Sequence, residues 1–442
     1  MGNETINMLD LTDRISMRKT LDGMNTVDIA EMLVELERRD LVRVFRMLSK
    51  DKAAEVFAFL GRDQQQSIIE AITDREIANI VDELFLDDAV DFIEEMPAGV
   101  VKRVLATVTP DTRNLINLFL QYPEDSAGSI MTIEYIDLKA SMTVTDAFTQ
   151  IRVTGLDKET IYNCYVTDSE RRLIGTVSVR TLFLHPGNSL IADIMEPVVI
   201  YANTHDDRET LMESFRDNGV IAVPVVDNER RLVGIVTFDD ALQVQEEETT
   251  EDFEKLAGIS PADEPYLKNG IIAMSKDRIP WLFLLNLSVF ITGAIVAGYE
   301  NLLAVLPVLV SFLPMLMDTS GDAGSQSSTL IIRGMATGDI KMTDFSAVIW
   351  KEIRVALVCG VVLSAANYLR ILLMGFTADI ALTVSLAFFS ALFLAKTTGA
   401  LLPFAAKAIK LDPAVMAVPI LTTIVDASTL VVYFSLAKSL LQ

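Results

Sequence analysis

The chain is poor in residues that carry thiol, zinc or nucleophile chemistry. Its 442 residues include 2 cysteines and 2 histidines, and neither Cys164 nor Cys359 lies in a CxxC or Cys/His spacing. This pattern argues against disulfides, structural zinc and redox chemistry, and each cysteine is interpreted as a small buried apolar residue. His185 and His205 have no nucleophile constellation around them, and no phosphate-binding Walker sequence is present. An enzyme is therefore not predicted.

Positive charge is also scarce. The chain has 37 Lys and Arg residues against 61 Asp and Glu residues, and its formal net charge is −24. Such a chain repels nucleic acid backbones and anionic lipid surfaces, and it raises the local concentration of cations. Nucleic acid is not an expected partner. Most of the carboxylates are expected to be ordinary exposed charges, so only particular clusters support a functional prediction.

Long apolar runs are missing from the first part of the chain. Residues up to about Asp277 are charged and periodic, whereas the runs from Ile279 onwards exceed the length that spans a bilayer. This change predicts a soluble part followed by a membrane part. The first residues, MGNETINMLDLTDR, lack the basic start and apolar core of a signal peptide, so the amino terminus is expected to stay in the cytoplasm.

An internal repeat fills the first soluble segment. Seven octets, beginning at residues 29, 41, 53, 65, 77, 89 and 101, have apolar residues at their fourth, fifth and eighth positions. This spacing predicts two-turn helices, and Gly61, Pro97 and Pro110 mark joints between them. A single short helix cannot bury its apolar stripe alone. The repeats therefore predict an all-α superhelix over residues 1–124, a fold that implies interaction or sensing.

Two similar strand and helix units follow the superhelix. YVTDSERRLIGTVSVRTLF spans Tyr165–Phe183, VVDNERRLVGIVTFDDAL spans Val225–Leu242, and an Ile-Met pair precedes each copy. Each copy predicts two strands joined by a turn, with a helix after the second strand. The doubled pattern resembles a tandem pair of α/β cystathionine-β-synthase (CBS) domains, which we place at residues 125–188 and 189–245.

The resemblance to CBS pairs implies a nucleotide site. Such pairs often bind adenosine nucleotides, and a Gly, a Ser or Thr and an Asp at fixed spacing contact the ribose. Gly234, Thr237 and Asp240 fit this motif in the second copy, which implies ATP as a ligand. The first copy has Thr181 in place of the acid. Helix capping by Thr237 and Asp240 explains the second copy equally well.

The remaining chain predicts a connector and a helical membrane domain. Residues 246–276 predict an acidic connecting (plug) helix, followed by a Pro-containing bend. Residues 277–442 are expected to hold five transmembrane helices, several of them longer than a straight span requires. Pro307, Pro314 and Gly321–Gly324 predict breaks in the second helix, with the freed backbone groups facing a cavity. The helices are expected near residues 279–299, 302–333, 345–374, 378–406 and 413–441.

Basic residues predict how the protein is oriented in the membrane. Lys and Arg precede the first helix and flank the loops after the second and fourth, whereas the first and third connections have almost none. An excess of Lys and Arg places loops in the cytoplasm. We therefore expect a multi-pass plasma membrane protein with cytoplasmic N-terminal domains and an extracytoplasmic carboxyl terminus.

Two acidic residues lie inside apolar segments, where burial is costly. Asp426 lies within PILTTIVDASTLVVYF and Asp322 within SGDAGSQSSTL. An unpaired carboxylate in hydrocarbon costs about 3 kcal/mol on insertion scales, so each is expected to face a water-filled path. A hydrated Mg²⁺ suits such a lining because it keeps most of its waters. The alternatives are a protonated or inter-helix hydrogen-bonded Asp426, and an Asp322 that caps a half-helix.

The order of superhelix, CBS pair, connector and five helices resembles the MgtE family of magnesium channels. SGDAGSQSSTLIIRGMATGDI and DPAVMAVPILTTIVDASTLVVYF carry the resemblance in the membrane part. It implies a homodimer that imports Mg²⁺, with Asp426 as the central ion-binding residue of the pore. It also implies closure by intracellular Mg²⁺ bound between acidic cytoplasmic surfaces. The matching sensor carboxylates are Glu55, Asp87, Asp91, Asp240, Glu248, Glu251 and Asp252.

The chain departs from the family pattern near the predicted pore. Asp322 stands where the family usually has Asn, and Ala417 and Val418 stand where it has a small or polar pair. We hypothesise that the added acid strengthens cation attraction and relaxes the preference among divalent ions. Unchanged uptake ratios for Mg²⁺, Mn²⁺ and Ca²⁺ in Asp322→Asn would count against this hypothesis.

Two alternative functions remain at this point. The protein could transport or exchange another divalent cation, such as Mn²⁺, Co²⁺ or Ca²⁺, which competition fluxes would reveal. It could instead be a non-conducting membrane sensor that reports nucleotide levels through its CBS pair, in which case Asp426 is dispensable.

Overall fold

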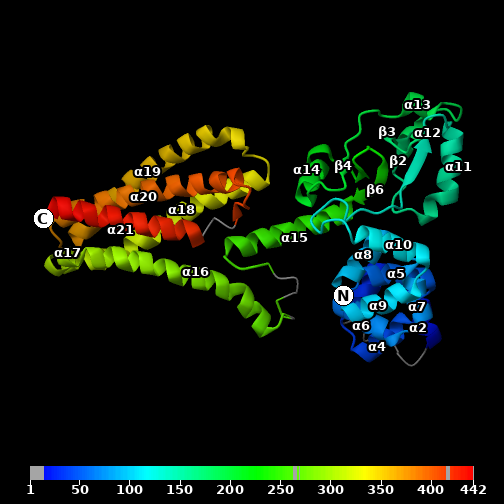
Figure 1. Cartoon of the computed structure of the whole chain (residues 1–442), viewed down its shortest axis with the longest axis horizontal. Coiled ribbons are helices and arrows are strands. Elements are labelled where there is room, and N and C mark those ends of the chain that lie inside the picture. Colours follow the sequence, from blue (N-terminus) through cyan, green and yellow to red (C-terminus); the bar gives the residue numbers. More distant parts are fainter. Residues whose placement is uncertain (1–13, 262–265, 268, 415–418, 442) are drawn as a thin grey trace. The chain divides into compact units, whose positions relative to one another are not determined.

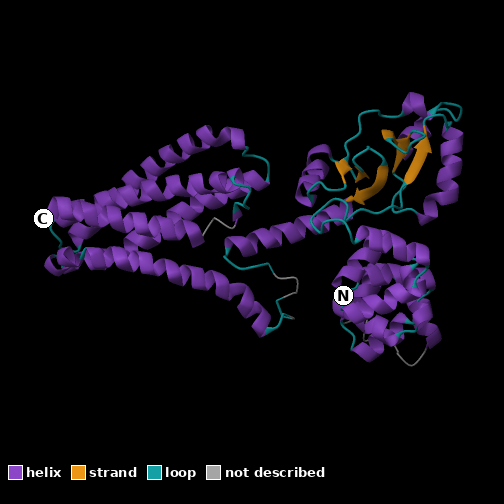
Figure 2. Ribbon diagram, in the orientation of Figure 1, coloured by secondary structure: helices purple, strands orange, loops and turns teal. Residues whose placement is uncertain are grey.

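The chain forms two compact units, Met1–Glu246 and Glu247–Gln442. This computed structural model describes residues 14–261, 266–267, 269–414 and 419–441. The first unit holds the short helices and both small sheets, and the second holds the long apolar helices (Figures 1 and 2). The predicted order of helical domain, CBS pair and helical membrane domain is therefore confirmed.

Short helices of the superhelix start at intervals of one repeat. After the first, they begin at residues 26, 38, 50, 62, 74, 86, 98 and 110. The regular start confirms that each repeat forms one helix. The helices are α2 (Arg14–Gly23), α3 (Thr26–Val34), α4 (Arg38–Phe45), α5 (Lys50–Ala58), α6 (Arg62–Ala71), α7 (Asp74–Val81), α8 (Leu86–Glu95), α9 (Ala98–Thr107) and α10 (Pro110–Phe119).

The apolar positions of the repeats form one continuous core. In α6 the fourth and fifth octet positions are Ile68 and Ile69, and both are completely buried. The eighth position, Ile72, is also buried but lies just beyond the helix end. The buried Gln65 keeps its polar group satisfied by donating to the Phe57 carbonyl at 3.0 Å. Neighbouring helices share this core, as a solenoid requires.

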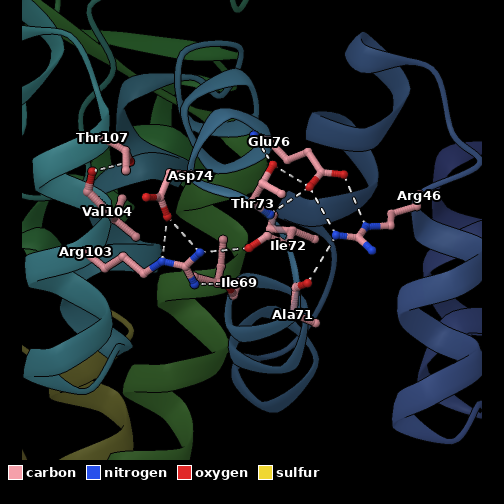
Figure 3. A network of polar contacts seen from close by, with 10 residues as sticks. All are labelled: Arg46, Ile69, Ala71, Ile72, Thr73, Asp74, Glu76, Arg103, Val104 and Thr107. Atoms are coloured by element: carbon pink, nitrogen blue, oxygen red, sulfur yellow. Dashed lines mark hydrogen bonds and ion pairs between the residues drawn. The ribbon is translucent and has the colours of Figure 1, made fainter.

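Two arginines, Arg46 after α4 and Arg103 on α9, contact the joint between α6 and α7 (Figure 3). Arg103 donates to the carbonyls of Ile69 at 2.7 Å and Ile72 at 2.8 Å. Arg46 donates to the Ala71 carbonyl at 3.2 Å. Carbonyls at a helix end have no partner inside the helix, so these contacts satisfy the end of α6. Thr73 then caps the start of α7 through a capping box with Glu76, the third residue of that helix.

Each CBS copy contains a small three-stranded sheet. In both sheets the first two strands are parallel and the last two antiparallel, with strand orders β1-β2-β3 and β4-β5-β6. The strands are β1 (Ile136–Lys139), β2 (Asn163–Thr167), β3 (Leu173–Ser178), β4 (Ala202–Asn203), β5 (Ala222–Val226) and β6 (Leu232–Thr237). The helical segments are α11 (Val144–Thr154), η1 (Gly155–Asp157), α12 (Val179–Leu184), α13 (Ile191–Ile194), α14 (Arg208–Asn218) and α15 (Phe238–Leu256).

The repeated turns have the same geometry in both copies. Asp168 accepts two backbone N–H groups of its own turn, and Asp227 does the same in the second copy. The Ile-Met pairs cross between the copies. Met195 of the second copy packs on Gly175 of the first, and Met131 of the first copy packs on Gly234 of the second. A Cβ at Gly234 would lie 2.7 Å from the Met131 sulfur and 2.8 Å from the Thr132 carbonyl oxygen, and the backbone contact makes any larger residue costly there.

Long helices form the membrane domain. The elements are α16 (Ile271–Gly298), α17 (Glu300–Val305), η2 (Pro307–Phe312), α18 (Leu313–Ala336), η3 (Met342–Asp344), α19 (Phe345–Leu373), α20 (Ala378–Ala408) and α21 (Pro419–Leu441). Among the described residues, four segments are long and apolar enough to cross a membrane. They are Ile271–Gly298, Met342–Leu373, Ala378–Ala408 and Ile420–Leu441. The fifth long helix, α18, is richer in polar residues.

The second predicted membrane helix is broken, but not at every expected place. Pro307 begins a 3₁₀ segment and Pro314 lies in the first turn of α18, so the breaks predicted there are confirmed. The break predicted at Gly321–Gly324 is wrong, because α18 continues through it. Asp322 consequently does not cap a half-helix. Gly324 instead allows close helix contact, since a Cβ there would lie 3.1 Å from the Ala395 carbonyl oxygen.

Candidate cation sites

A group of acidic side chains lies where the superhelix meets the second CBS copy. Asp87 on α8 is 7% exposed, and its Oδ1 accepts the backbone N–H of Asp88 at 2.9 Å. Burial, followed by the negative charge of Asp240 on α15, raises the pKa of Asp87 well above its ordinary value. Two sensor carboxylates predicted from sequence are therefore brought together. Their mutual repulsion makes this place attractive for a cation.

Two further carboxylates join this group, although sequence reasoning did not single them out. Burial, and then the charge of Asp240, raises the pKa of Asp88 to about 6 and that of Glu159 to about 8. One Glu159 oxygen is buried and has no hydrogen-bond partner in the described structure. No three acids in the described residues already converge closely enough to hold a metal.

Two other predicted sensor residues lie elsewhere on the superhelix. Glu55 is exposed on α5 and Asp91 is exposed on α8. Neither is among the charges that shift the pKa of Asp87. Their predicted role in cation sensing stays a prediction.

The raised pKa values predict how stability depends on pH. A carboxyl whose pKa is raised by folding binds its proton more tightly in the folded state. Lowering the pH from about 8, the pKa of Glu159, through about 6, that of Asp88 and Asp240, should therefore stabilise this unit. In EDTA, we expect the unfolding temperature of the purified protein to rise by about 2–4 °C per kcal/mol gained.

Added Mg²⁺ should raise the unfolding temperature most at high pH, because protons compete with the cation for the same oxygens. The matched variant is Asp88→Asn with Glu159→Gln, which removes two of the titrating groups. It should be more stable than the parent near pH 8 and less dependent on pH. Equal pH dependence of parent and variant would contradict the assignment.

The predicted connecting helix is the second half of α15, which runs without interruption from Phe238 to Leu256. Lys255 forms ion pairs with Glu251 and with Asp412, the latter at 2.8 Å between Nζ and Oδ2. Burial opposes the charge on Lys255, but hydrogen bonds to these acids outweigh it and raise the lysine pKa. Burial, and next the charge of Asp412, raises the pKa of Asp252. Glu248 is half-buried on the same helix.

The predicted nucleotide motif has a clear structural explanation in the second copy. Gly234 packs against Met131 and the Thr132 carbonyl, and the Thr237 hydroxyl oxygen lies 2.6 Å from a carboxylate oxygen of both Asp239 and Asp240, which share its proton. Asp240 also accepts the Thr237 backbone N–H. Thr237 and Asp240 thus stabilise the start of α15, as the capping alternative expected. A role for these residues in nucleotide binding stays a prediction.

One face of α18 carries several exposed or half-buried polar residues. Asp322, Ser325, Gln326 and Thr329 line a hollow along this helix. The opposite face is buried and rich in small residues, including Gly321 and Gly324. α18 is therefore amphipathic within a largely apolar bundle, and its polar face needs water or another polar surface.

Asp426 belongs to the same region. It is half-buried on α21, and Asp318 on α18 lies close enough to repel it electrostatically. Next to this pair, the Ser320 hydroxyl contacts the Thr429 hydroxyl at 3.1 Å, which joins the two helices. Asp318 was missed in the sequence, although its spacing of four from Asp322 places both on one helix face. Ala417 and Val418 lie outside the described residues.

Comparison with known proteins identifies the family. A magnesium transporter MgtE from Thermus thermophilus is 35% identical over 434 residues, which cover 97% of this chain and 96% of that protein. The chain belongs to the MgtE family. Family models agree, matching the MgtE divalent cation transporter at residues 313–436, the MgtE intracellular N domain at 24–125 and a CBS domain at 191–247.

Further MgtE relatives cover the soluble and membrane parts. A magnesium transporter MgtE from Enterococcus faecalis is 32% identical, covering 74% of this chain and 72% of that protein. The crystal structure of the cytosolic domain of the Mg²⁺ channel MgtE in complex with ATP matches with a TM-score of 0.52 and 33% identity. It covers 55% of this chain and 100% of that one. These relatives are transporters, in agreement with the prediction that the chain is not an enzyme.

Proposed function

We propose that this protein transports Mg²⁺ across a membrane through a path lined by α18 and α21. The observation that carries the proposal is that Asp318, exposed on α18, and Asp426, half-buried on α21, lie close enough to repel each other within the membrane domain. Acids in such a place are costly unless a cation and its waters compensate them. Magnesium suits them because it retains several waters and needs only one or two carboxylates. The MgtE relatives, named magnesium transporters, support the same ion.

The proposed pore is formed by two copies of the chain. Asp322 and Gln326 are exposed on α18, so a single chain leaves the polar face uncovered. A lipid-facing surface of this kind is unfavourable in a bilayer. A symmetric dimer would place two such faces around one aqueous path. The soluble domains would lie in the cytoplasm and the carboxyl terminus outside, because the basic loops favour that orientation.

Intracellular Mg²⁺ is proposed to close the pore through the acidic group of the first unit. Asp87, Asp88, Asp240 and Glu159 repel one another when ionised, which disfavours their compact arrangement. A divalent cation binding between them favours the compact state by its differential affinity. The connecting half of α15 then links this group to the membrane domain along the chain. Removing the cation would disfavour the compact state and so open the pore.

ATP is proposed as a ligand of the CBS pair. A relative's cytosolic domain was crystallised in complex with ATP, and the second copy here has the Gly234, Thr237 and Asp240 motif. Asp240 would then belong to both the nucleotide motif and the acidic group. ATP and Mg²⁺ would consequently influence each other's binding, and by thermodynamic linkage the influence is reciprocal.

Uptake into liposomes tests the proposed function. The purified protein should admit Mg²⁺, with Mn²⁺, Co²⁺ and Ca²⁺ competing less well, and flux should rise when Mg²⁺ is depleted on the cytoplasmic side. Preferential uptake of another divalent ion would favour the alternative transporter. Absence of any divalent flux, together with ATP binding, would favour a non-conducting sensor.

A further inference from the structure

A lysine is buried inside the membrane domain, away from the acidic face of α18. Lys396 lies in the interior of α20 and is 6% exposed. Its Nζ is 3.5 Å from the Ala323 carbonyl oxygen and 3.4 Å from the Ser327 hydroxyl oxygen, both on α18. A charged group among membrane helices is costly unless oxygens surround it. Its position therefore calls for an explanation beyond apolar packing.

The contact continues from Ser327 to a third helix. The Ser327 hydroxyl donates to Oε2 of Glu352 on α19 at 2.7 Å. Ammonium, hydroxyl and carboxylate thus form a chain from α20 through α18 to α19. Each hydrogen bond in such a chain polarises the next, and the negative Glu352 compensates the positive Lys396. Removing either charge would leave the other without its counter-charge.

This hydrogen-bonded chain lies beside a close crossing of α18 and α20. A Cβ on Gly399 would lie 2.2 Å from the carbonyl oxygen of Gly324, so the two backbones touch. Gly399 is one turn beyond Lys396 on α20. The Ala323 carbonyl faces the ammonium, and the residue before it, Asp322, lies on the polar face of α18. The lysine and the acidic face therefore lie on opposite sides of the same helical turn.

We propose that the Lys396 ammonium is a tethered cation, permanently filling a monovalent-cation site made by the Ala323 carbonyl, the Ser327 hydroxyl and Glu352. Its role is to position α18 and the acidic face that the transported ion meets. A free ion in this site would exchange with the ions in the pore, whereas a lysine side chain cannot leave. The position of α18 is thereby independent of which ions are present. This inference rests on the proposed transport function.

Charge removal tests the proposal in the full-length protein in liposomes. Lys396→Met keeps the length and apolar volume of the side chain but leaves Glu352 without its counter-charge. Mg²⁺ uptake should fall roughly tenfold, as when the groups that orient metal ligands are removed. The double variant Lys396→Met with Glu352→Gln removes both charges and should recover most of the uptake. Lys407→Met, an exposed position on the same helix, should leave uptake unchanged.

A chemical rescue separates the charge from the fold. Lys396→Ala removes three methylene groups and the ammonium, which propylammonium replaces in both length and charge. Propylammonium should restore part of the uptake, while propanol, which is similar in length but uncharged, should not. Wild-type uptake by Lys396→Met, a double variant no better than the single, or equal effects of the two additives would each overturn the proposal. Failure of the wild-type protein to transport Mg²⁺ would instead refute the proposed function.

Discussion

Replacing Asp426 by Ala or Asn should abolish Mg²⁺ uptake while the protein still folds and inserts. Asp426 is half-buried on α21 and faces the negative charge of Asp318, so a cation between them relieves both burial and repulsion. Loss of a group that merely orients metal ligands costs 10–100-fold, so loss of a direct ligand should cost about 100-fold or more. Asp426→Glu keeps the charge and should retain more activity than Asp426→Asn.

The control for Asp426 is Asp379→Asn. Asp379 is an exposed carboxylate in the first turn of α20, and its removal takes away the same charge from the membrane domain. Uptake should remain near that of the parent, measured with a magnesium-sensitive dye inside the liposomes. If Asp426→Ala still transported Mg²⁺ at the parent rate, the path between α18 and α21 would be wrong, and the sensor-only alternative would gain support.

Periodicity predicted the soluble fold well because, in a short repeat, the position of a residue within the repeat determines whether its side chain is buried. The spacing of the octets matches the spacing of the helix starts from α3 to α9, although each octet begins three residues after its helix, since each apolar stripe must face its neighbours. In the membrane part the same local reasoning was less successful. Glycines at 321 and 324 suggested a broken helix, yet α18 is continuous there. Gly324 instead makes a close backbone contact with Ala395, which belongs to a helix far along the chain.

In the candidate sites too, sequence found the residues that local patterns mark and missed those that only distant contacts make important. Asp87 and Asp240 were found through resemblance, whereas Asp426 was found as an acid inside an apolar segment. The structure gives Asp87 and Asp240 a shared electrostatic environment. Glu159 was missed because nothing in its local sequence distinguishes it from an exposed acid. Its importance comes only from folding, which places its charge near that of Asp240. Charge clusters assembled from separate elements cannot be read from spacing along the chain.

Neutralising the pair Asp87→Asn and Asp240→Asn should leave the transporter open when internal Mg²⁺ is high. The two carboxylates come from different domains of the first unit, and each contributes to the charge that a bound cation would compensate. Without them the compact state no longer depends on the ion. At high internal Mg²⁺ we expect flux to rise roughly tenfold, the scale of a typical allosteric coupling, while flux after depletion stays near that of the parent.

The matched control is Asp28→Asn with Asp111→Asn, two exposed acids of the superhelix that remove the same formal charge. This variant should close at high internal Mg²⁺ like the parent, because general surface charge does not assemble a site. Limited proteolysis gives a second readout, since the parent should be protected by Mg²⁺ and the Asp87 and Asp240 variant should not. Normal closure of that variant would mean that the cation acts elsewhere, and the exposed acids Glu55 and Asp91 would then be the positions to substitute next.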